Sequence, residues 1–323
     1  MRRKVIIVFA VLFTLVPGVS NYPAGATDYP TRDITFIVPY VTGGSADPIS
    51  RMFVTQLEKT LKAGINVVNK PGGTSTIGCG FVVRANPDGY TIGMGSNSAL
   101  SHQPLVNTGL AYKTPDDYQS IVKLGDMPAI LAVRADAPWK TFEEFMADVR
   151  KKPGEIRAGN SGVGSIPDLI IRQLNKAAGV KIRPMPFSGG GGEAVIALLG
   201  GRIEAFNCYS ASVVSFVKAG KVRVLGVYKK GKFDLFPEAT PIGDSYDATL
   251  TAMFSVIAPK GMPKDVLDKL VNASMQAVKT PEFIAFTKSN GYVPEAKGPD
   301  GVKKELEDYM VVMAELIKDD VKK

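Results

Sequence analysis

Three segments of this 323-residue chain place small, hydroxyl or amide residues where a strand is expected to end. They are Tyr40, Val41, Thr42, Gly43 and Gly44; Ser96, Asn97 and Ser98; and Ser161, Gly162, Val163, Gly164 and Ser165. Glycine leaves backbone amides uncovered, and each charge-assisted hydrogen bond from such a group to a carboxylate contributes roughly 1.5 to 3 kcal/mol. One such loop is equally consistent with a tight turn, but the recurrence favours an anion site.

Other chemistries fit the sequence poorly. His102 is the only histidine, so a Ser-His-Asp hydrolase would have to use it, and residues 159–163 miss the G-x-S-x-G pattern by one place. A polar loop histidine is the alternative. One histidine and two distant cysteines give no zinc cluster. Residues 72–80 lack the Lys-Ser/Thr ending of a P-loop, and no G-x-G-x-x-G follows a strand, so neither a nucleotide nor another cofactor is expected.

The first loop is expected between a strand and a helix. Residues 34–38 are typical of a buried strand, which Pro39 ends. Asp47 followed by Pro48 predicts an N-cap and a first helical residue. The positive end of that helix would therefore face the loop.

A second unit of the same kind is expected at residues 156–178. Ser165 and Asp168 have the spacing of a capping box at the start of its helix, and Gly179 is typical of a helix end. The two units could face one ligand.

Strands and helices alternate along the chain, which predicts an α/β fold with mostly parallel sheets covered on both faces. Further strands are expected at residues 65–69, 90–94, 131–134, 181–187, 203–206, 222–227 and 251–258. Further helices are expected near residues 77–82, from residue 141, and at 193–199, 213–219, 264–278, 281–289 and 299–318. Ligands bind beyond the carboxyl ends of such strands, where the glycine loops lie. The region after residue 251 shows no ligand loop and is expected to pack on the first domain.

Residues 1–26 have the features of a secretory signal. Three basic residues precede an apolar run at 5–16, and small residues allow cleavage after Ala26. An uncleaved membrane anchor is the alternative, but the apolar run is shorter than the ~20 residues that cross a bilayer, which favours the cleaved signal. Subtracting the three basic residues from the net charge of +8 leaves +5, interspersed with acids, which argues against nucleic acid and favours small anions.

Short motifs recur in a fixed order along the mature chain. They are Tyr29-Pro30, residues 37–40, Gly43-Gly44 with Asp47, residues 69–72, residues 87–91, residues 161–165, Pro186-Phe187 with Gly189-Gly190, residues 218–221, Ala258-Pro259 and residues 263–265. In this order they resemble the tripartite tricarboxylate transporter receptor family, the Bug or TctC-like periplasmic solute-binding proteins.

The resemblance implies two α/β domains of the type II periplasmic binding-protein kind, joined by two strands that cross near Met127 and Thr251. The domains would comprise residues 27–127 with 252–323, and residues 128–251. The family's ligand loops map onto residues 41–47 and 161–168, with residues 96–98 nearby.

Two positions depart from the family pattern. Asp168 stands where members usually carry histidine, and Cys208 where many carry aspartate. Both positions face or approach the cleft between the domains in the family. Asp168 could repel a second carboxylate, bind a cationic group, or only cap its helix. Because the crossings would put Cys79 and Cys208 in different domains, no disulfide is expected.

The function that the resemblance implies is a monomeric, non-enzymatic, periplasmic binding protein. It would capture a small mono-, di- or tricarboxylate, aromatic acids included, by hinge closure and deliver it to a tripartite tricarboxylate-type permease. The alternatives are an exported enzyme that uses Asp47 or Asp168 as a base, and a binding protein that signals to a sensor.

Overall fold

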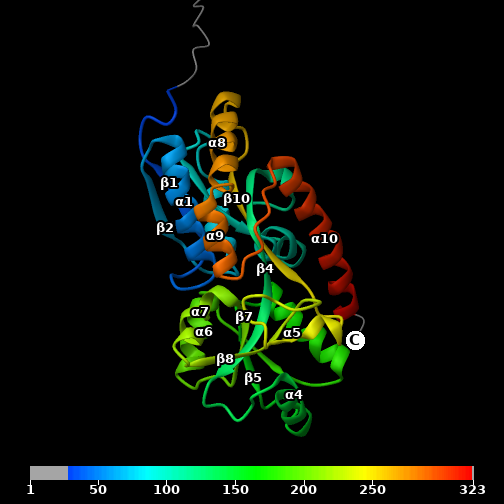
Figure 1. Cartoon of the computed structure of the whole chain (residues 1–323). Coiled ribbons are helices and arrows are strands. Elements are labelled where there is room, and N and C mark those ends of the chain that lie inside the picture. The colour runs from blue at the N-terminus through cyan, green and yellow to red at the C-terminus, as the bar shows by residue number, and fades with distance from the viewer. Residues whose placement is uncertain (1–27, 322–323) are drawn as a thin grey trace, which may run out of the picture.

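The structure, a computed structural model, describes residues 28–321 and consists of two α/β lobes (Figure 1). The predicted signal peptide and its cleavage site after Ala26 lie outside the described residues. Within residues 28–321, every helix is too short or too polar to cross a membrane.

The first lobe is a sheet between two layers of helices. Its strands are ordered β2 (Ile65–Asn69), β1 (Ile34–Val38), β3 (Thr91–Ser96), β10 (Thr251–Pro259) and the first part of β4 (Tyr118–Arg134). One face carries α1 (Ala46–Leu61), α8 (Lys264–Ala277) and α9 (Pro281–Ser289), and the other carries α2 (Thr76–Val83), α3 (Gln103–Val106) and α10 (Pro299–Val321).

The side chains of β1 point alternately to the two faces of the sheet, which explains these two layers of helices. Phe36 and Val38 join the core beneath α1, whereas Ile37 points to the opposite face and packs with Val82 of α2. Successive strand residues point to opposite sides, so an apolar strand with period two needs helices on both.

The second lobe has its own sheet. Its strands are ordered β6 (Arg183–Pro186), β5 (Arg157–Asn160), β7 (Ala205–Tyr209), the second part of β4, β8 (Val222–Val227) and β9 (Thr240–Pro241). Its helices are α4 (Phe142–Lys151), α5 (Ile166–Ala178), α6 (Gly191–Leu199) and α7 (Val214–Lys218).

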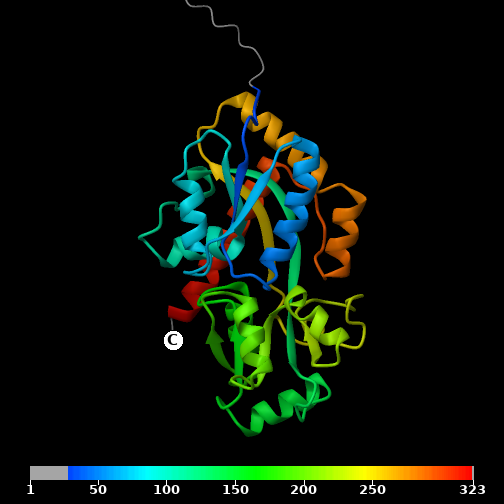
Figure 2. The ribbon, with the colours of Figure 1, turned by 90° about the vertical axis from the view of Figure 1, so that its left-hand side faces the viewer.

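Strand β4 runs through both lobes, as the long strand in Figure 2 shows. Residues 118–128 pair with β10, and residues 129–134 pair with β7 and β8. The sequence predicted only residues 131–134 as strand, because Lys123, Gly125 and Asp126 interrupt the apolar pattern. A segment near Val293 pairs with this interrupted part: Asp126 N donates to the Val293 carbonyl at 3.0 Å.

The sheets are more mixed than predicted. The pairs β1–β2, β1–β3, β5–β6, β5–β7 and β8–β9 are parallel, whereas every pair formed by β4 or β10 with another described strand is antiparallel. Strand β4 leaves the first lobe and β10 returns to it, so these two strands run in opposite directions, and the local pattern of residues carries no sign of that direction. The predicted α/β, two-domain architecture is confirmed.

Candidate functional site

The predicted loops meet where the two lobes touch. Hydrogen bonds cross this crevice from Val41 N to the Gly189 carbonyl (3.2 Å), between the hydroxyls of Ser45 and Ser212 (3.1 Å), from the Thr74 hydroxyl to the Val163 carbonyl (3.0 Å) and from Ile166 N to the Ser98 hydroxyl (3.1 Å). The lobes are therefore closed against each other in this structure.

The N-termini of α1 and α6 face each other across the crevice. A Cβ atom on Gly44 would lie 3.2 Å from the backbone nitrogen of Gly192, and one on Gly192 would lie 2.9 Å from the nitrogen of Gly44. The preceding Gly43 has a φ of +79°, which favours glycine for backbone reasons. Backbone amides from both lobes thus gather at one point, beside two positive helix ends.

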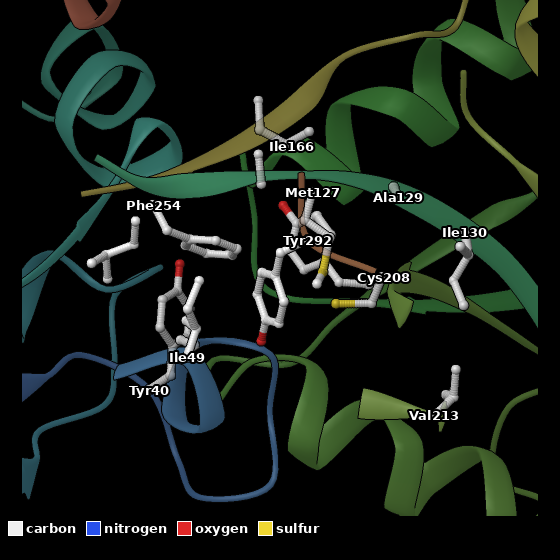
Figure 3. Packing of buried hydrophobic residues seen from close by; sticks show 14 of the residues in the cluster. Tyr40, Ile49, Met127, Ala129, Ile130, Ile166, Cys208, Val213, Phe254 and Tyr292 are labelled. Carbon is white, nitrogen blue, oxygen red and sulfur yellow. The ribbon is translucent and has the colours of Figure 1, made fainter. Parts of the chain in front are cut away.

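A central cavity of about 10 Å³ lies at this point, which is room for about one water molecule. It is lined by Tyr40, Gly44, Ser45, Ala46, Ser161, Gly191, Tyr209 and Phe254. Tyr40 and Phe254 lie close together in Figure 3. Burial raises the pKa of Tyr40 to about 12, so its hydroxyl keeps the proton and can donate a hydrogen bond.

Residues 96–98 have three different roles. The Ser96 hydroxyl lies 3.2 Å from that of Tyr40, next to the central cavity. The Asn97 side chain instead holds strand β10, since it donates to the Thr251 carbonyl and accepts from Met253 N. Ser98 bridges to the second lobe through Ile166. Only Ser96 is thus placed toward the cavity.

The loop before α5 is divided between two cavities. Ser161 lines the central one, whereas Gly162, Val163 and Gly164 line a second cavity of about 650 Å³. Ser165 caps α5, since its hydroxyl accepts a hydrogen bond from Asp168 N at 3.3 Å. This cap was predicted, and it is confirmed.

Asp168 is buried inside this loop. Its carboxylate accepts hydrogen bonds from Asn160 Nδ2 at 3.0 Å, from Gly164 N at 3.0 Å and from Arg172 Nε at 3.2 Å. In a capping box the carboxylate would instead bond the backbone nitrogen of Ser165, so this half of the prediction is wrong. The cause is Gly164, whose positive φ of +69° brings its own N–H to the carboxylate.

The predicted N-cap at Asp47 is also wrong. Helix α1 begins at Ala46, and Asp47 lies within its first turn. The Asp47 carboxylate accepts hydrogen bonds from Arg51 Nε and Asn69 Nδ2, both at 2.9 Å. These local partners explain its position away from the residues that line the central cavity.

Cys208 is buried beneath the start of α6. A Cβ on Gly191 would lie 2.8 Å from the Cys208 sulfur, and burial raises the pKa of this thiol to about 12. Cys79 lies on α2 of the other lobe, and both are free thiols. The prediction of no disulfide is confirmed.

Ser45 and Ala46 lie within the predicted ligand loop 41–47, but sequence reasoning missed three other residues that line the central cavity, namely Gly191, Tyr209 and Phe254. Gly191 belongs to the glycine run 189–192, which lies between the predicted strand 181–187 and the predicted helix 193–199 and could have been assigned to the site. Tyr209 and Phe254 lie on strands from different lobes, with ring centroids 5.9 Å apart, and no local motif marks them.

Comparison with known proteins gives a consistent result. Residues 49–320 match the model of the tripartite tricarboxylate transporter family receptor. A UPF0065 protein from the TAR-I ttuE-ttuC' intergenic region of Agrobacterium vitis is 32% identical over 291 residues, which cover 88% of this chain and 81% of the relative.

Solved structures agree with the match. A structure described as a periplasmic transporter has a TM-score of 0.85 at 28% identity and covers 90% of this chain and 97% of its own. The periplasmic binding protein BugD has a TM-score of 0.80 at 26% identity, covering 90% and 98%.

Proposed function

The chain belongs to the tripartite tricarboxylate transporter receptor family of periplasmic solute-binding proteins, and from this premise we propose that it captures a small organic carboxylate between its lobes. In this proposal the acid is bound without chemical change and is then presented to a membrane permease of the tripartite tricarboxylate type. The family is one of receptors and not of enzymes, which supports the first step.

The facing N-termini of α1 and α6 carry the proposal. Each helix end bears about half a positive charge, and the two ends are so close that a Cβ atom on Gly44 would lie 3.2 Å from the backbone nitrogen of Gly192. Two positive ends that meet repel each other, whereas a carboxylate between them would be attracted by both. The anion would therefore favour closure.

Lobe closure is the proposed capture mechanism. A central cavity of about 10 Å³ is smaller than any organic acid, so the lobes must separate for the acid to enter. With the acid between them, the lobes would close to a slightly wider position than the one in this structure, stabilised by groups from both lobes, with Ser161 on one side and Ser96 with Tyr40 on the other.

The location and the domain boundaries are part of the same proposal. We place signal cleavage after Ala26, which N-terminal sequencing of the exported protein checks. The first domain comprises residues 27–127 with 252–323, and the second comprises residues 128–251. The change of β4 partners after Pro128 supports this division.

Calorimetric titration tests the binding step. The mature chain is unfolded, freed of bound solutes, refolded and titrated with succinate, citrate and benzoate, and with phosphate and sulfate as inorganic anions. We expect at least one carboxylate to bind and to be recovered unchanged. Binding of phosphate or sulfate in the absence of any carboxylate binding would contradict the proposal.

Delivery is tested in cells. A strain that lacks this chain should lose uptake of the identified acid, and the wild-type chain should restore it. Normal uptake in the strain that lacks the chain would contradict the proposed role in transport, while the proposed binding of the acid would still stand.

A further inference from the structure

The second cavity is large enough for a small molecule and has walls from both lobes. Its volume of about 650 Å³ is within the usual range for ligand pockets, roughly 300 to 1,000 Å³. Thr74, His102 and Val106 line it from the first lobe, and Val163 and Arg172 from the second. The end of α10 completes it, and Figure 1 shows this helix running from the first lobe down beside α5.

Neighbouring residues of one loop line this cavity and the central one. Ser161 lines the central cavity, while the next two residues line the outer one. Next to Ser161, a Cβ on Gly162 would lie 2.6 Å from the Thr74 hydroxyl oxygen, and that hydroxyl donates a hydrogen bond to the Val163 carbonyl. Thr74 belongs to the first lobe, so lobe separation would open a path between the two cavities.

The walls of the outer cavity are mainly apolar. Val106, Leu169, Leu316 and Ile317 contribute aliphatic side chains, and Val106 is 51% exposed. Aliphatic surface of this kind favours burial of hydrocarbon at about 25 cal/mol per Å². The walls therefore suit an apolar body and not a small, fully hydrated ion.

One end of the cavity is polar. The Arg172 guanidinium contacts Asp168 through Nε and one Nη, yet its side chain is 49% exposed. His102 is only 5% exposed, and its Nδ1 lies buried with no hydrogen-bond partner among residues 28–321. Burial lowers the pKa of His102, while Asp168 acts in the opposite direction. Arg172 is thus the cation that this end offers to a ligand.

We propose that the outer cavity is a distal subsite, which takes the apolar body and the far polar group of an elongated carboxylate whose first carboxylate lies between α1 and α6. This inference rests on the proposed function and narrows its substrate class to acids with an aliphatic or aromatic body and a second acceptor group. Arg172 binds that acceptor group, and Ile317 contacts the body.

Three acids of graded structure test the subsite in titrations of the refolded mature chain. Adipate has a body of four methylene groups and a distal carboxylate, hexanoate has a body alone, and succinate has a distal carboxylate on a body that is two methylene groups shorter. We expect adipate to bind most tightly. Ile317→Asp should weaken adipate at least ten-fold more than succinate, and Arg172→Gln should weaken adipate about ten-fold more than hexanoate.

Val312→Asp is the matched control. Val312 lies on the same helix α10 and is 42% exposed, and it is absent from the cavity lining. This variant adds the same charge and should leave all three affinities as in the wild type. Thermal melts of the unliganded variants verify folding.

The outcomes separate the two proposals. If the wild type binds no carboxylate at all, both fall. If it binds succinate and adipate equally, or if Ile317→Asp and Arg172→Gln weaken all acids alike, the distal subsite is overturned and carboxylate capture stands.

Discussion

At the scale of single residues, glycine is needed at positions 43 and 44, before α1, for two different physical reasons. Gly43 has a positive φ and open space around it, so its backbone requires glycine but its surroundings do not. For Gly44 the reverse holds, because its neighbour is the backbone of Gly192 in the opposite lobe. Replacing each one therefore tests a different property.

Gly44→Val should weaken carboxylate binding by about ten- to a hundred-fold, because a branched side chain keeps the amides of Gly44 and Gly192 apart. Its melting temperature without ligand should stay near that of the wild type. Gly43→Ala should instead lower the free energy of unfolding by about 1 to 2 kcal/mol and affect binding less. Titration and thermal melts give both quantities. If a well-folded Gly44→Val protein binds the carboxylate with unchanged affinity, the loop before α1 is not part of the binding site.

Local signals predicted local structure well, and contacts between distant segments were out of their reach. Ser165 and Gly179 mark the ends of α5 by rules that involve only neighbouring residues, and both were predicted correctly. Tyr209 and Phe254 reach the cavity because two sheets meet there, which no spacing in the sequence shows. The predicted N-cap at Asp47 was wrong, because the Asp47 carboxylate instead accepts a hydrogen bond from Asn69 on strand β2.

At the scale of elements, the cap of α5 also positions a binding loop, and the cap of α4 offers a matched comparison. The Ser165 hydroxyl accepts from Asp168 N at 3.3 Å, and the Thr141 hydroxyl accepts from Glu144 N at 3.2 Å. Ser165→Ala and Thr141→Ala should each lower the free energy of unfolding by about 1 kcal/mol. Only Ser165→Ala should also weaken binding, since its loop contains Ser161.

Urea unfolding and calorimetric titration distinguish these effects. Equal binding by both variants would show that the α5 cap is structural and that the loop keeps its shape without it.

Strand β4 carries a buried charge cluster beside the point where it leaves the first lobe. Lys123 is fully buried, and its ammonium donates to Asp126 at 2.7 Å, to Glu295 at 2.7 Å and to Glu305 at 2.6 Å. The local pattern does not predict a strand here, because two of the three partners of Lys123, Glu295 and Glu305, lie 172 and 182 residues further along the chain. Burial raises the pKa of Asp126 to about 6, although Lys123 opposes this shift.

Asp126→Asn should change the pH dependence of stability. The folded pKa of Asp126 lies above its ordinary value of 3.8, so its stabilising protonation is complete below pH 3.8 and is lost as the pH rises through about 6. Relative to the wild type, the variant should therefore gain roughly 2 to 3 kcal/mol between pH 4 and pH 7. Urea unfolding at several pH values measures this difference. A difference that stays constant with pH would contradict the raised pKa.

At the scale of the whole molecule, closure depends on how few segments hold the lobes together. Strand β4 is continuous through both sheets, β10 begins where the chain returns from the second lobe, and α10 reaches α5 from the first (Figure 1). Because few segments cross between the lobes, one lobe can rotate relative to the other. The contacts across the crevice are single hydrogen bonds, which can break together when the lobes separate. Binding and opening are therefore coupled through the same surfaces.

A reversible cross-link between the lobes tests whether opening is required for binding. The hydroxyls of Ser45 and Ser212 lie 3.1 Å apart on opposite lobes, so Ser45→Cys with Ser212→Cys should form a disulfide in the closed position. Cys79→Ala and Cys208→Ala are included, because the Cys208 sulfur lies near the same site as the Ser212 hydroxyl. The oxidised protein should fail to take up the acid that the wild type binds, since its central cavity holds about one water molecule. Reduction should restore uptake, and Ser45→Cys alone should bind under both conditions. Oxidised protein that binds with unchanged affinity would show that the acid enters without separation of the lobes.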